Sequence, residues 1–324
     1  MNCQPDDRAE ASRHPMKRSL LLTIGFCGIL SAAESLDWIN SLGGNVEKNA
    51  KGGVVAVNLR GAWVNDVELI DLARLPNLER LDLSHTRISD EGMRNLKSAT
   101  NIRELSLYYS EQITDQGMTA IKGWKFLRRL QLRGTRISNG TLEILSHMPQ
   151  LESLDIANTQ VTENGMEYLI ALTSLKELAL GRGRLGDADL SFLRMLPSLT
   201  ELDLSGAKPL PPDTNGKVRR RIPPPPTMPQ KTLDALAELK NLRRLKLGYS
   251  GISSVDLKEL SKLQNVERLG LEACPRIDDT AAVALAEWKN LKYVDLQATQ
   301  VTSQGVAALR KAKPGIQILY TPAS

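Results

Sequence analysis

Leucine and other aliphatic residues recur along the chain as Leu-x-x-Leu-x-Leu, and the pattern returns every 24 or 25 residues. One wider interval separates Leu199 from Leu242, and a degenerate first copy begins near Val54. Self-similarity at such a period is typical of solenoids, in which each copy forms one structural unit. The units begin at Leu78, Ile102, Leu127, Leu151, Leu175, Leu199, Leu242, Val266 and Leu291.

Within a unit, the spacing of apolar residues changes from that of a strand to that of a helix. Residues 78–83 alternate with a period of two, whereas Met93 and Leu96 stand at helical spacing. No unit can bury its leucine face alone, so neighbouring units must stack with their strands side by side. We therefore expect an α/β solenoid, a curved array with parallel strands on the concave face and helices on the convex face.

The sequence Ile-Ser/Thr-Asp-x-Gly-Met follows the strand at residues 88–93 and again at 113–118. With the leucine pattern, it resembles the leucine-rich-repeat family, in its ribonuclease-inhibitor-like and cysteine-containing subtypes and of the exported bacterial kind. The resemblance covers about residue 54 to the C-terminus and implies a right-handed array. The family places Asn or Cys at the ninth position of each unit, which here holds Thr86, Ser110, Thr135, Thr159, Gly183, Ala207, Ser250, Cys274 and Thr299.

These ninth residues are mostly small and polar, so their side chains can turn inward and bond to backbone groups left unpaired where the strand ends. Cys274 is thus predicted to be structural. Gly183 and Ala207 interrupt the series.

Both ends of the array need a cover. At the N-terminus we predict a cap over residues 34–53, with a helix stopped by Gly43 and Gly44 and a hairpin turned at Gly52 and Gly53. At the other end, Pro314-Gly315 precedes a last strand over residues 316–320. The repeat array is therefore expected to span residues 54–324.

A proline-rich basic insertion interrupts the array at about residues 208–231. It contains Arg219-Arg220-Arg221 and four prolines at 223–226, which cannot pair in a sheet, so we expect an extended loop that leaves the solenoid. It is either a docking arm for an aromatic groove or an anionic surface, or a tolerated loop.

The N-terminus has the layout of a secretory signal: Met16-Lys17-Arg18, then an apolar run, then Ser31-Ala32-Ala33. We predict that residues 1–33 are an extension and signal peptide, that the signal starts at Met16 and that cleavage follows Ala33. The apolar run is too short to span a bilayer, so no stable membrane insertion is expected after its removal. A buried N-terminal helix is the alternative.

The net charge of +5 is unevenly distributed. Residues 208–231 contribute +5 by themselves and residues 1–33 add +1, which leaves −1 for the rest. A nucleic-acid-binding fold should carry a basic stripe, so nucleic acid is not an expected partner.

The chain holds little material for catalysis. Beyond the predicted signal only His85 and His147 remain, in different registers, and no phosphate-binding, nucleophile-elbow or zinc-protease motif is present. The recurring Asp90, Asp115, Asp187 and Asp279 are interpreted as helix caps rather than metal ligands. We therefore predict no enzyme, no cofactor and no metal.

The candidate binding surface follows from register, since strand positions three, five and seven face the concave side. Acidic residues fall in the middle units with basic residues on both sides, and Tyr108 and Tyr293 are candidate aromatic anchors. Small residues such as Ala157, Ala179 and Gly181 are expected to leave the centre open. The candidate contacts are Tyr108, Arg129, Arg133, Asp155, Glu177, Glu201, Asp203, Arg244, Lys246, Arg268 and Tyr293.

Alternating charge favours a protein or peptide ligand over a polyanion, so the leading hypothesis is an exported, monomeric, non-catalytic scaffold. The resemblance suggests an alternative, because cysteine-containing repeats often accompany a ubiquitin-ligase recruitment box: an adaptor or host-directed effector. The chain leaves no stretch for that box. A third hypothesis is a carbohydrate-acting enzyme that uses Glu177 or Glu201.

Overall fold

The computed structural model describes residues 36–181, 189–206 and 225–321. The predicted signal peptide, most of the proline-rich insertion, and the positions Gly183, Asp187 and Ala207 lie outside these residues. The predictions made for them therefore have no structural counterpart.

Strands and short helices alternate through the described residues. The strands are β1 Asn45–Lys48, β2 Val54–Asn58, β3 Arg80–Asp82, β4 Glu104–Ser106, β5 Arg129–Gln131, β6 Ser153–Asp155, β7 Glu177–Ala179, β8 Glu201–Asp203, β9 Arg244–Lys246, β10 Arg268–Gly270, β11 Tyr293–Asp295 and β12 Gln317–Leu319. The α-helices are α1 Asp37–Ser41, α2 Leu69–Ala73, α3 Asp90–Asn95, α4 Asp115–Met118, α5 Asn139–Leu145, α6 Gln230–Ala237, α7 Ser254–Glu259, α8 Ala281–Ala286 and α9 Ser303–Ala312. The 3-10 helices are η1 Thr119–Gly123, η2 Glu163–Ala171, η3 Ser191–Met195 and η4 Leu260–Lys262.

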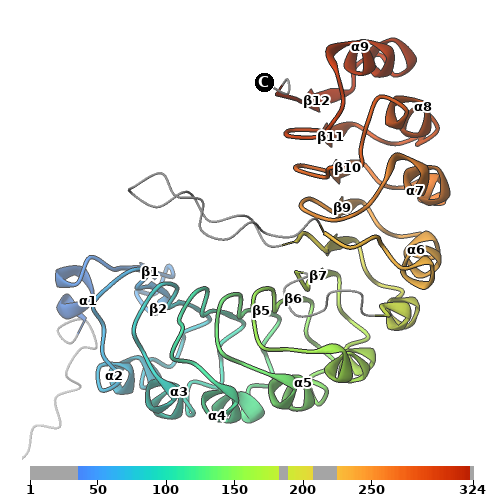
Figure 1. Cartoon of the computed structure of the whole chain (residues 1–324). Coiled ribbons are helices and arrows are strands. Elements are labelled where there is room, and N and C mark those ends of the chain that lie inside the picture. Colours follow the sequence, from blue (N-terminus) through green and yellow to red (C-terminus); the bar gives the residue numbers. More distant parts are fainter. Residues whose placement is uncertain (1–35, 182–188, 207–224, 322–324) are drawn as a thin grey trace, which may run out of the picture.

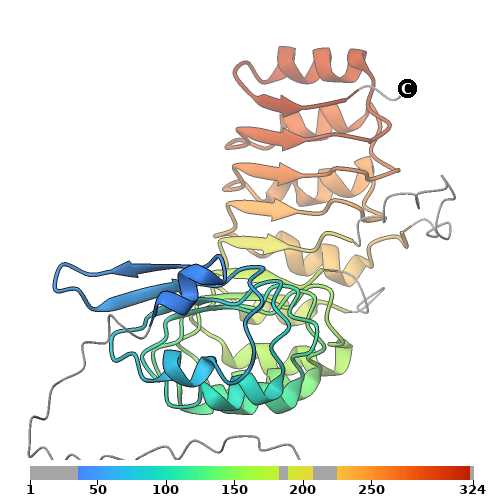
Figure 2. The ribbon, with the colours of Figure 1, turned by 90° about the vertical axis from the view of Figure 1, so that its left-hand side faces the viewer.

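The twelve strands form one sheet in chain order, from β1 to β12. Only the pair of β1 and β2 is antiparallel; the later strands pair in parallel. Figure 1 shows the strands lining the inner side of a curved array with the helices outside, and Figure 2 shows the strands stacked unit on unit. The predicted α/β solenoid is confirmed.

The core is a continuous, mainly aliphatic column between strands and helices, with Trp124 and Trp288 fully buried in it. From each strand one set of leucines points inward, so Leu81 and Leu83 are almost fully buried, and Met93 and Leu96 meet them from the helix side. A fully buried leucine contributes about 2 kcal/mol relative to an exposed one. Since both neighbouring units cover each leucine layer, stacking is the main source of stability.

The ninth-position side chains turn inward as predicted. Thr86 Oγ1 donates to the carbonyl of Leu83 at 2.7 Å, and Ser110 Oγ of the next unit donates to the same carbonyl at 2.8 Å. Cys274 Sγ does the same to Leu247, at 3.1 Å. Burial raises the pKa of the Cys274 thiol to about 11, so this cysteine is a neutral structural residue.

Asp90 and Asp115 lie in the first turns of α3 and α4, where the prediction placed favourable negative charge, but they do not cap their own helices. Ser89 and Thr114 cap helices α3 and α4 with their own side chains. The Asp90 carboxylate instead accepts from the backbone N–H and hydroxyl of Thr114 in the next unit, at 2.8 and 2.6 Å. The Asp90 and Asp279 carboxylates thus tie their units to the caps of the next ones, a contact that the sequence of a single unit cannot show.

Asp115 makes the largest set of such bonds. It accepts from the backbone N–H groups and hydroxyls of Ser138 and Thr141. Burial alone raises the pKa of Asp115, but the hydrogen bonds from Ser138 and Thr141 outweigh it, so the pKa lies below its ordinary value. In the following unit Asn139 takes the same place toward Thr162.

Steric crowding explains why the fifth position of the motif Ile-Ser/Thr-Asp-x-Gly-Met is glycine. A Cβ on Gly117 would lie 2.5 Å from Asp90 Oδ1 and 3.1 Å from Asp90 Cα. Gly92 and Gly305 meet the aspartates of their preceding units in the same way. Glycine is needed here because the preceding carboxylate must reach the helix cap.

A helix and a hairpin lie at the N-terminal end of the array. Helix α1 precedes the hairpin of β1 and β2, with left-handed backbone at Gly43 and Gly52. Ile39 is fully buried against the first unit. At the other end, Gly315 turns the chain into β12, which pairs with β11.

The proline-rich insertion ends earlier than predicted. Thr227 already pairs with Gly251, and Met228 is buried in the core. Gln230 and Lys231 are the first residues of helix α6. The predicted end at residue 231 was wrong because Met228 supplies an apolar contact that draws the chain back to the solenoid before the helix begins.

Replacing Gly117 by Ala should lower the free energy of unfolding by about 1–2 kcal/mol, because the clash with Asp90 outweighs the gain in helix propensity. Gly123, at the end of η1, is the matched control, since a Cβ there meets nothing within 4 Å. Denaturant unfolding of both variants gives the comparison. Equal stabilities of Gly117→Ala and Gly123→Ala would show that the close approach is unimportant.

Candidate functional site

The concave face is built from side chains that stand in rows across the sheet. Adjacent strands pair without slip, so Arg80 is opposite Glu104 and Glu104 is opposite Arg129. Neighbours in a row therefore lie about 4.8 Å apart. Position three gives the row Arg80, Glu104, Arg129, Ser153, Glu177, Glu201, Arg244, Arg268, Tyr293 and Gln317, and position five gives Asp82, Ser106, Gln131, Asp155, Ala179, Asp203, Lys246, Gly270, Asp295 and Leu319.

The charges of the position-three row bind one another. Arg129 reaches across Ser153 to Glu177 at 2.9 Å and also lies 3.9 Å from Glu104. Arg244 pairs with Glu201 at 2.7 Å. The acidic middle is thus neutralised by the basic residues on both of its sides.

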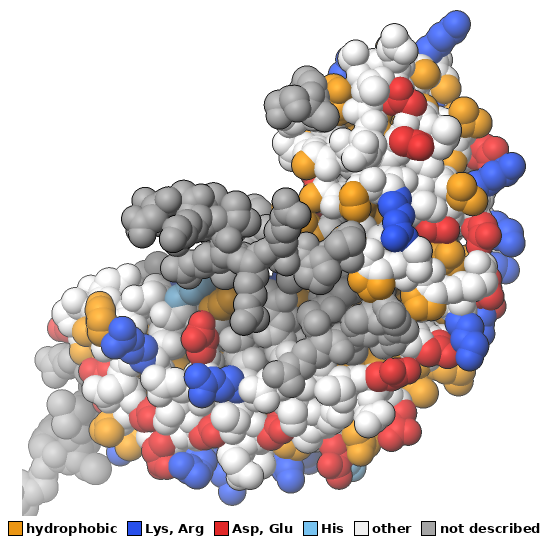
Figure 3. Space-filling view, in the orientation of Figure 1, with side chains coloured by type: hydrophobic (Ala, Val, Ile, Leu, Met, Phe, Trp, Pro, Cys, Tyr) orange, Lys and Arg blue, Asp and Glu red, His pale blue; other side chains and the backbone are white. Residues whose placement is uncertain are grey.

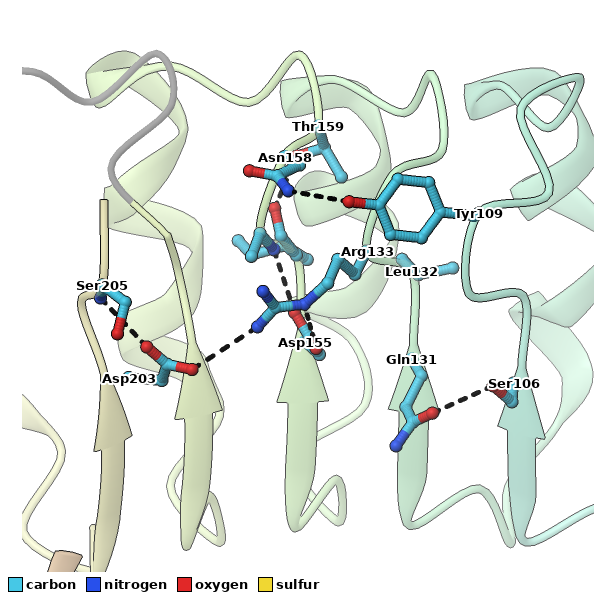
Figure 4. A network of polar contacts seen from close by, with 12 residues as sticks. Ser106, Tyr109, Gln131, Leu132, Arg133, Asp155, Asn158, Thr159, Asp203 and Ser205 are labelled. Carbon is cyan, nitrogen blue, oxygen red and sulfur yellow. Dashed lines mark hydrogen bonds and ion pairs between the residues drawn. The ribbon is translucent and has the colours of Figure 1, made fainter. Parts of the chain in front are cut away.

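Arg133, at position seven, binds two carboxylates of the position-five row. Its Nε donates to Asp155 at 2.9 Å and its Nη2 to Asp203 at 3.5 Å, as Figure 4 shows. Lys246 lies 3.8 Å from the same Asp203 carboxylate. The side chains of Arg133, Asp155 and Asp203 are only 24%, 20% and 17% exposed, so this group is far less solvated than an ordinary surface ion pair.

Burial sets the electrostatics of this group. It lowers the pKa of Arg133, but the attraction of Asp155 and then Asp203 outweighs it and raises that pKa overall. Burial raises the pKa of Asp155, since the arginine offsets only part of the desolvation and Asp203 adds repulsion. Loss of Arg133 would therefore leave two close carboxylates without their main counter-charge.

The sheet brings most of the predicted contact residues together. The remaining three stand apart: Arg268 lies over the ring of Tyr293, 4.3 Å from its centroid, and Tyr108 belongs to a ring cluster. The residues joined by ion pairs are Arg129, Arg133, Asp155, Glu177, Glu201, Asp203, Arg244 and Lys246.

The hollows of the concave face include two that the described strand residues line. The larger, of about 340 Å³, lies over strands β1 to β7, with Glu47, Arg80, Asp82, Gln131 and Glu177 among its lining. The central one, of about 170 Å³, holds Arg133, Asp155, Ala179, Asp203 and Lys246. Ala179 leaves this centre open, as predicted.

Four position-seven residues predicted to face outward are buried: Ser84, Ala157, Gly181 and Gly248. Ser84 has no exposed surface, because its hydroxyl bonds to Asp82 and to Ser106, the latter at 2.8 Å. Ala157 is equally buried and lies against Gly181. The strand has ended by this position, so alternation no longer decides the direction of the side chain.

Sequence reasoning missed a ring cluster beside the concave face. His85 and Tyr109 stack with their ring centroids 5.7 Å apart, and Tyr108 meets both rings edge-on. Asn158 Nδ2 donates to the Tyr109 hydroxyl at 3.2 Å (Figure 4). The sequence could have predicted this contact, because His85 and Tyr109 both occupy the eighth position of adjacent units and therefore lie side by side.

The described residues contain no group of three or more His, Cys, Asp or Glu side chains placed to hold a metal ion. His147 accompanies Glu143 in a convex hollow of about 510 Å³, away from His85. Within the part of the chain that the structure describes, no helix is long and apolar enough to cross a membrane.

The family model "Leucine Rich repeat" matches residues 74–97, one unit of the array. No curated protein matches the chain. The solved structure of an internalin (inlF) from Listeria monocytogenes is similar with a TM-score of 0.54 and 15% identity, covering 90% of this chain and 94% of that one. The matched unit and this likeness support the leucine-rich-repeat family and show its solenoid fold.

Two further structures are similar at lower TM-scores. Internalin C2 (inlC2) from Listeria monocytogenes has a TM-score of 0.46 and 20% identity, with 72% of this chain and 84% of that chain covered. A leucine-rich-repeat protein from Leptospira interrogans has a TM-score of 0.48 and 20% identity, with 77% of this chain but 62% of that chain covered.

Replacing Arg133 by Gln should cost about 2 kcal/mol of unfolding free energy near neutral pH, because it leaves Asp155 and Asp203 close together without the arginine. When the pKa of an aspartate is higher in the native state than in the unfolded state, the native state binds more protons. The free energy of unfolding therefore rises as the pH falls toward the pKa that the aspartate has in the unfolded chain, about 3.9. The deficit of the variant should therefore shrink in mild acid.

Thermal unfolding over that pH range measures the effect. Arg129→Gln is the control, because its ion pairs are more exposed and should contribute less than about 1 kcal/mol. A deficit for Arg133→Gln that does not vary with pH, or that matches the control, would contradict this account.

Proposed function

We propose that the chain is a non-catalytic scaffold that binds a protein or peptide partner on the concave face of its sheet. The observation that carries this proposal is the lattice of ion pairs around Arg129, Arg133 and Arg244. It holds charged side chains in fixed positions on a rigid sheet. Such a surface loses little side-chain entropy when a partner binds.

The lattice also limits the kind of partner. Because acidic and basic groups already neutralise one another, the described residues of the face offer no stripe of free positive charge to a nucleic acid. A partner binds more tightly when its charges are opposite to those of the face or when its side chains fill the hollows. A protein with a different arrangement of charges binds more weakly. The proposed contacts remain Tyr108, Arg129, Arg133, Asp155, Glu177, Glu201, Asp203, Arg244, Lys246, Arg268 and Tyr293.

The structure offers less support to the carbohydrate-enzyme hypothesis. Glycoside hydrolysis needs one carboxyl group to protonate the leaving oxygen and another to act on the sugar. Glu177 and Glu201 are neighbours in register, but each is paired with an arginine. Neither is free for those roles.

We also propose that the scaffold is of the exported kind and works outside the cytoplasm. The support is the pattern from Met16 to Ala33: a basic start, an apolar run and small residues. N-terminal sequencing of the protein recovered from the medium or envelope of an expressing bacterium should begin at Glu34. Recovery only from the cytoplasm, with the N-terminus intact, would refute export.

Blocking the central hollow should abolish partner binding. Ala179→Trp places a large ring among Asp155, Asp203 and Lys246 without removing an ion pair, and should weaken capture of the partner by at least about tenfold. Val255→Trp, on the outer helix α7 where Val255 is 72% exposed, is the matched control. The measurement is quantitative affinity capture with the immobilised full chain.

Melting temperatures establish first that both tryptophan variants fold. The concave-face proposal predicts capture by the wild type and by Val255→Trp, and loss with Ala179→Trp. Equal capture by the two variants, or no reproducible protein partner for the wild type, would reject it.

A further inference from the structure

Six side chains of the first three units gather at the carboxyl ends of the strands, beside the concave face. They come from the turns that follow β2, β3 and β4, and three are rings that contact one another. Figure 3 shows a histidine with basic and hydrophobic side chains at the N-terminal part of the visible face. The members of this aromatic–arginine surface are Arg60, Trp63, His85, Arg87, Tyr108 and Tyr109.

The rings form a fixed platform. His85 and Tyr109 are nearly parallel, with 2° between their planes, and Tyr108 lies edge-on to both at 5.3 and 4.8 Å. The Tyr109 ring covers Gly134, where a Cβ would come within 2.6 Å of it. Its hydroxyl is held by Asn158 two units further on.

The turns at this surface place rings where small residues are conformationally cheaper. His85 and Tyr109 have φ values of 57° and 54°, while the matching positions of the units on either side are Gly61 and Gly134. Left-handed backbone costs a residue with a Cβ about 1–2 kcal/mol, and glycine avoids that cost. The same left-handed conformation recurs at the eighth position of later units, at Asn158, Tyr249, Ala273 and Ala298, so it belongs to the repeat; at this surface, rings fill it in two adjacent units.

Arg60 and Arg87 each lie over an aromatic ring. Arg60 lies over Tyr108, 5.6 Å from the ring centroid, and Arg87 lies over Trp63 at 4.7 Å. Within the described residues neither forms an ion pair, in contrast to Arg129 and Arg133. Trp63 is 75% exposed, so this end of the surface is open to a ligand.

The chemistry of this surface defines a ligand. Guanidinium groups bind carboxylates with two parallel hydrogen bonds, and exposed ring faces pack against apolar or aromatic side chains. Three neighbouring units extend over about 10 Å, which is the length of about three residues of an extended peptide. Two cations match a pair of carboxylates better than a long row of phosphates.

We propose that the aromatic–arginine surface binds a short acidic segment of the partner, with carboxylates on Arg60 and Arg87 and an aromatic side chain between them on the rings. This inference rests on the proposed function, because it takes the partner to be a protein or peptide. In this proposal, the acidic segment of the partner binds to the turns that follow β2, β3 and β4, and not to the ion-paired residues of the sheet.

Fluorescence anisotropy with the full chain tests the proposal. The probe is a labelled peptide of alternating Asp and Phe with Gly-Ser flanks; one comparison peptide replaces Asp by Asn, and another replaces Phe by Ser. Both comparison peptides should bind more weakly. The double variant Arg60→Gln/Arg87→Gln should lose about tenfold in affinity for the Asp-Phe peptide, and added salt should weaken wild-type binding.

Arg103→Gln is the matched control. Arg103 also lies 5.6 Å from a ring centroid, that of Phe126, but it precedes β4, at the opposite ends of the strands, and is paired with Glu79. This variant should bind the Asp-Phe peptide like the wild type. A trigalacturonate probe tests the other acidic ligand class.

Four results would overturn the inference: no binding of the Asp-Phe peptide, equal binding of the Asn-Phe peptide, equal losses in the double variant and in Arg103→Gln, or tighter Arg60- and Arg87-dependent binding of trigalacturonate. These outcomes are separate from the fate of the proposed function. If the partner is captured and Ala179→Trp abolishes capture, the concave scaffold stands even when the acidic-peptide site fails.

Discussion

The burial of one leucine layer between two neighbouring units is the constraint on which the rest of this structure depends. A single unit of 24 or 25 residues has an aliphatic face that only the next unit can cover, and the strands must pair without slip for the faces to meet. That absence of slip places equivalent residues in straight rows. The ion pairs of the concave face follow from those rows.

On the helix side, the same stacking is reinforced by polar contacts between units. Asp90 and Asp115 bind the helix caps of the following units, and Gly117 has no side chain because the Asp90 carboxylate occupies that space. Inward hydroxyls and the Cys274 thiol satisfy strand-end carbonyls. These bonds use groups that would otherwise be buried without partners, so each is worth more than its strength in water suggests.

The concave face and the turns beside it have opposite electrostatic characters. Along the sheet, Arg129, Arg133 and Arg244 are neutralised by carboxylates one or more strands away. In the first turns, Arg60 and Arg87 lie over rings and form no ion pair within the described residues. A rigid, nearly neutral sheet flanked by a cationic aromatic surface is consistent with a binding scaffold in which different parts read different features of one partner.

The sequence by itself determined the period, the strands, and the inward residues such as Leu81 and Cys274. These features are local, since spacings of two and of three or four residues fix which side chains share a face. Only the tertiary structure decided the contacts between units. Arg129 pairs with Glu177, 48 residues away, and Arg133 pairs with Asp203, 70 residues away. These long side chains cross one or more strands, and sequence spacing does not fix their rotamers. The ring cluster and the pairing of Thr227 with Gly251 also depend on contacts between units, because their partners become neighbours only after the units stack.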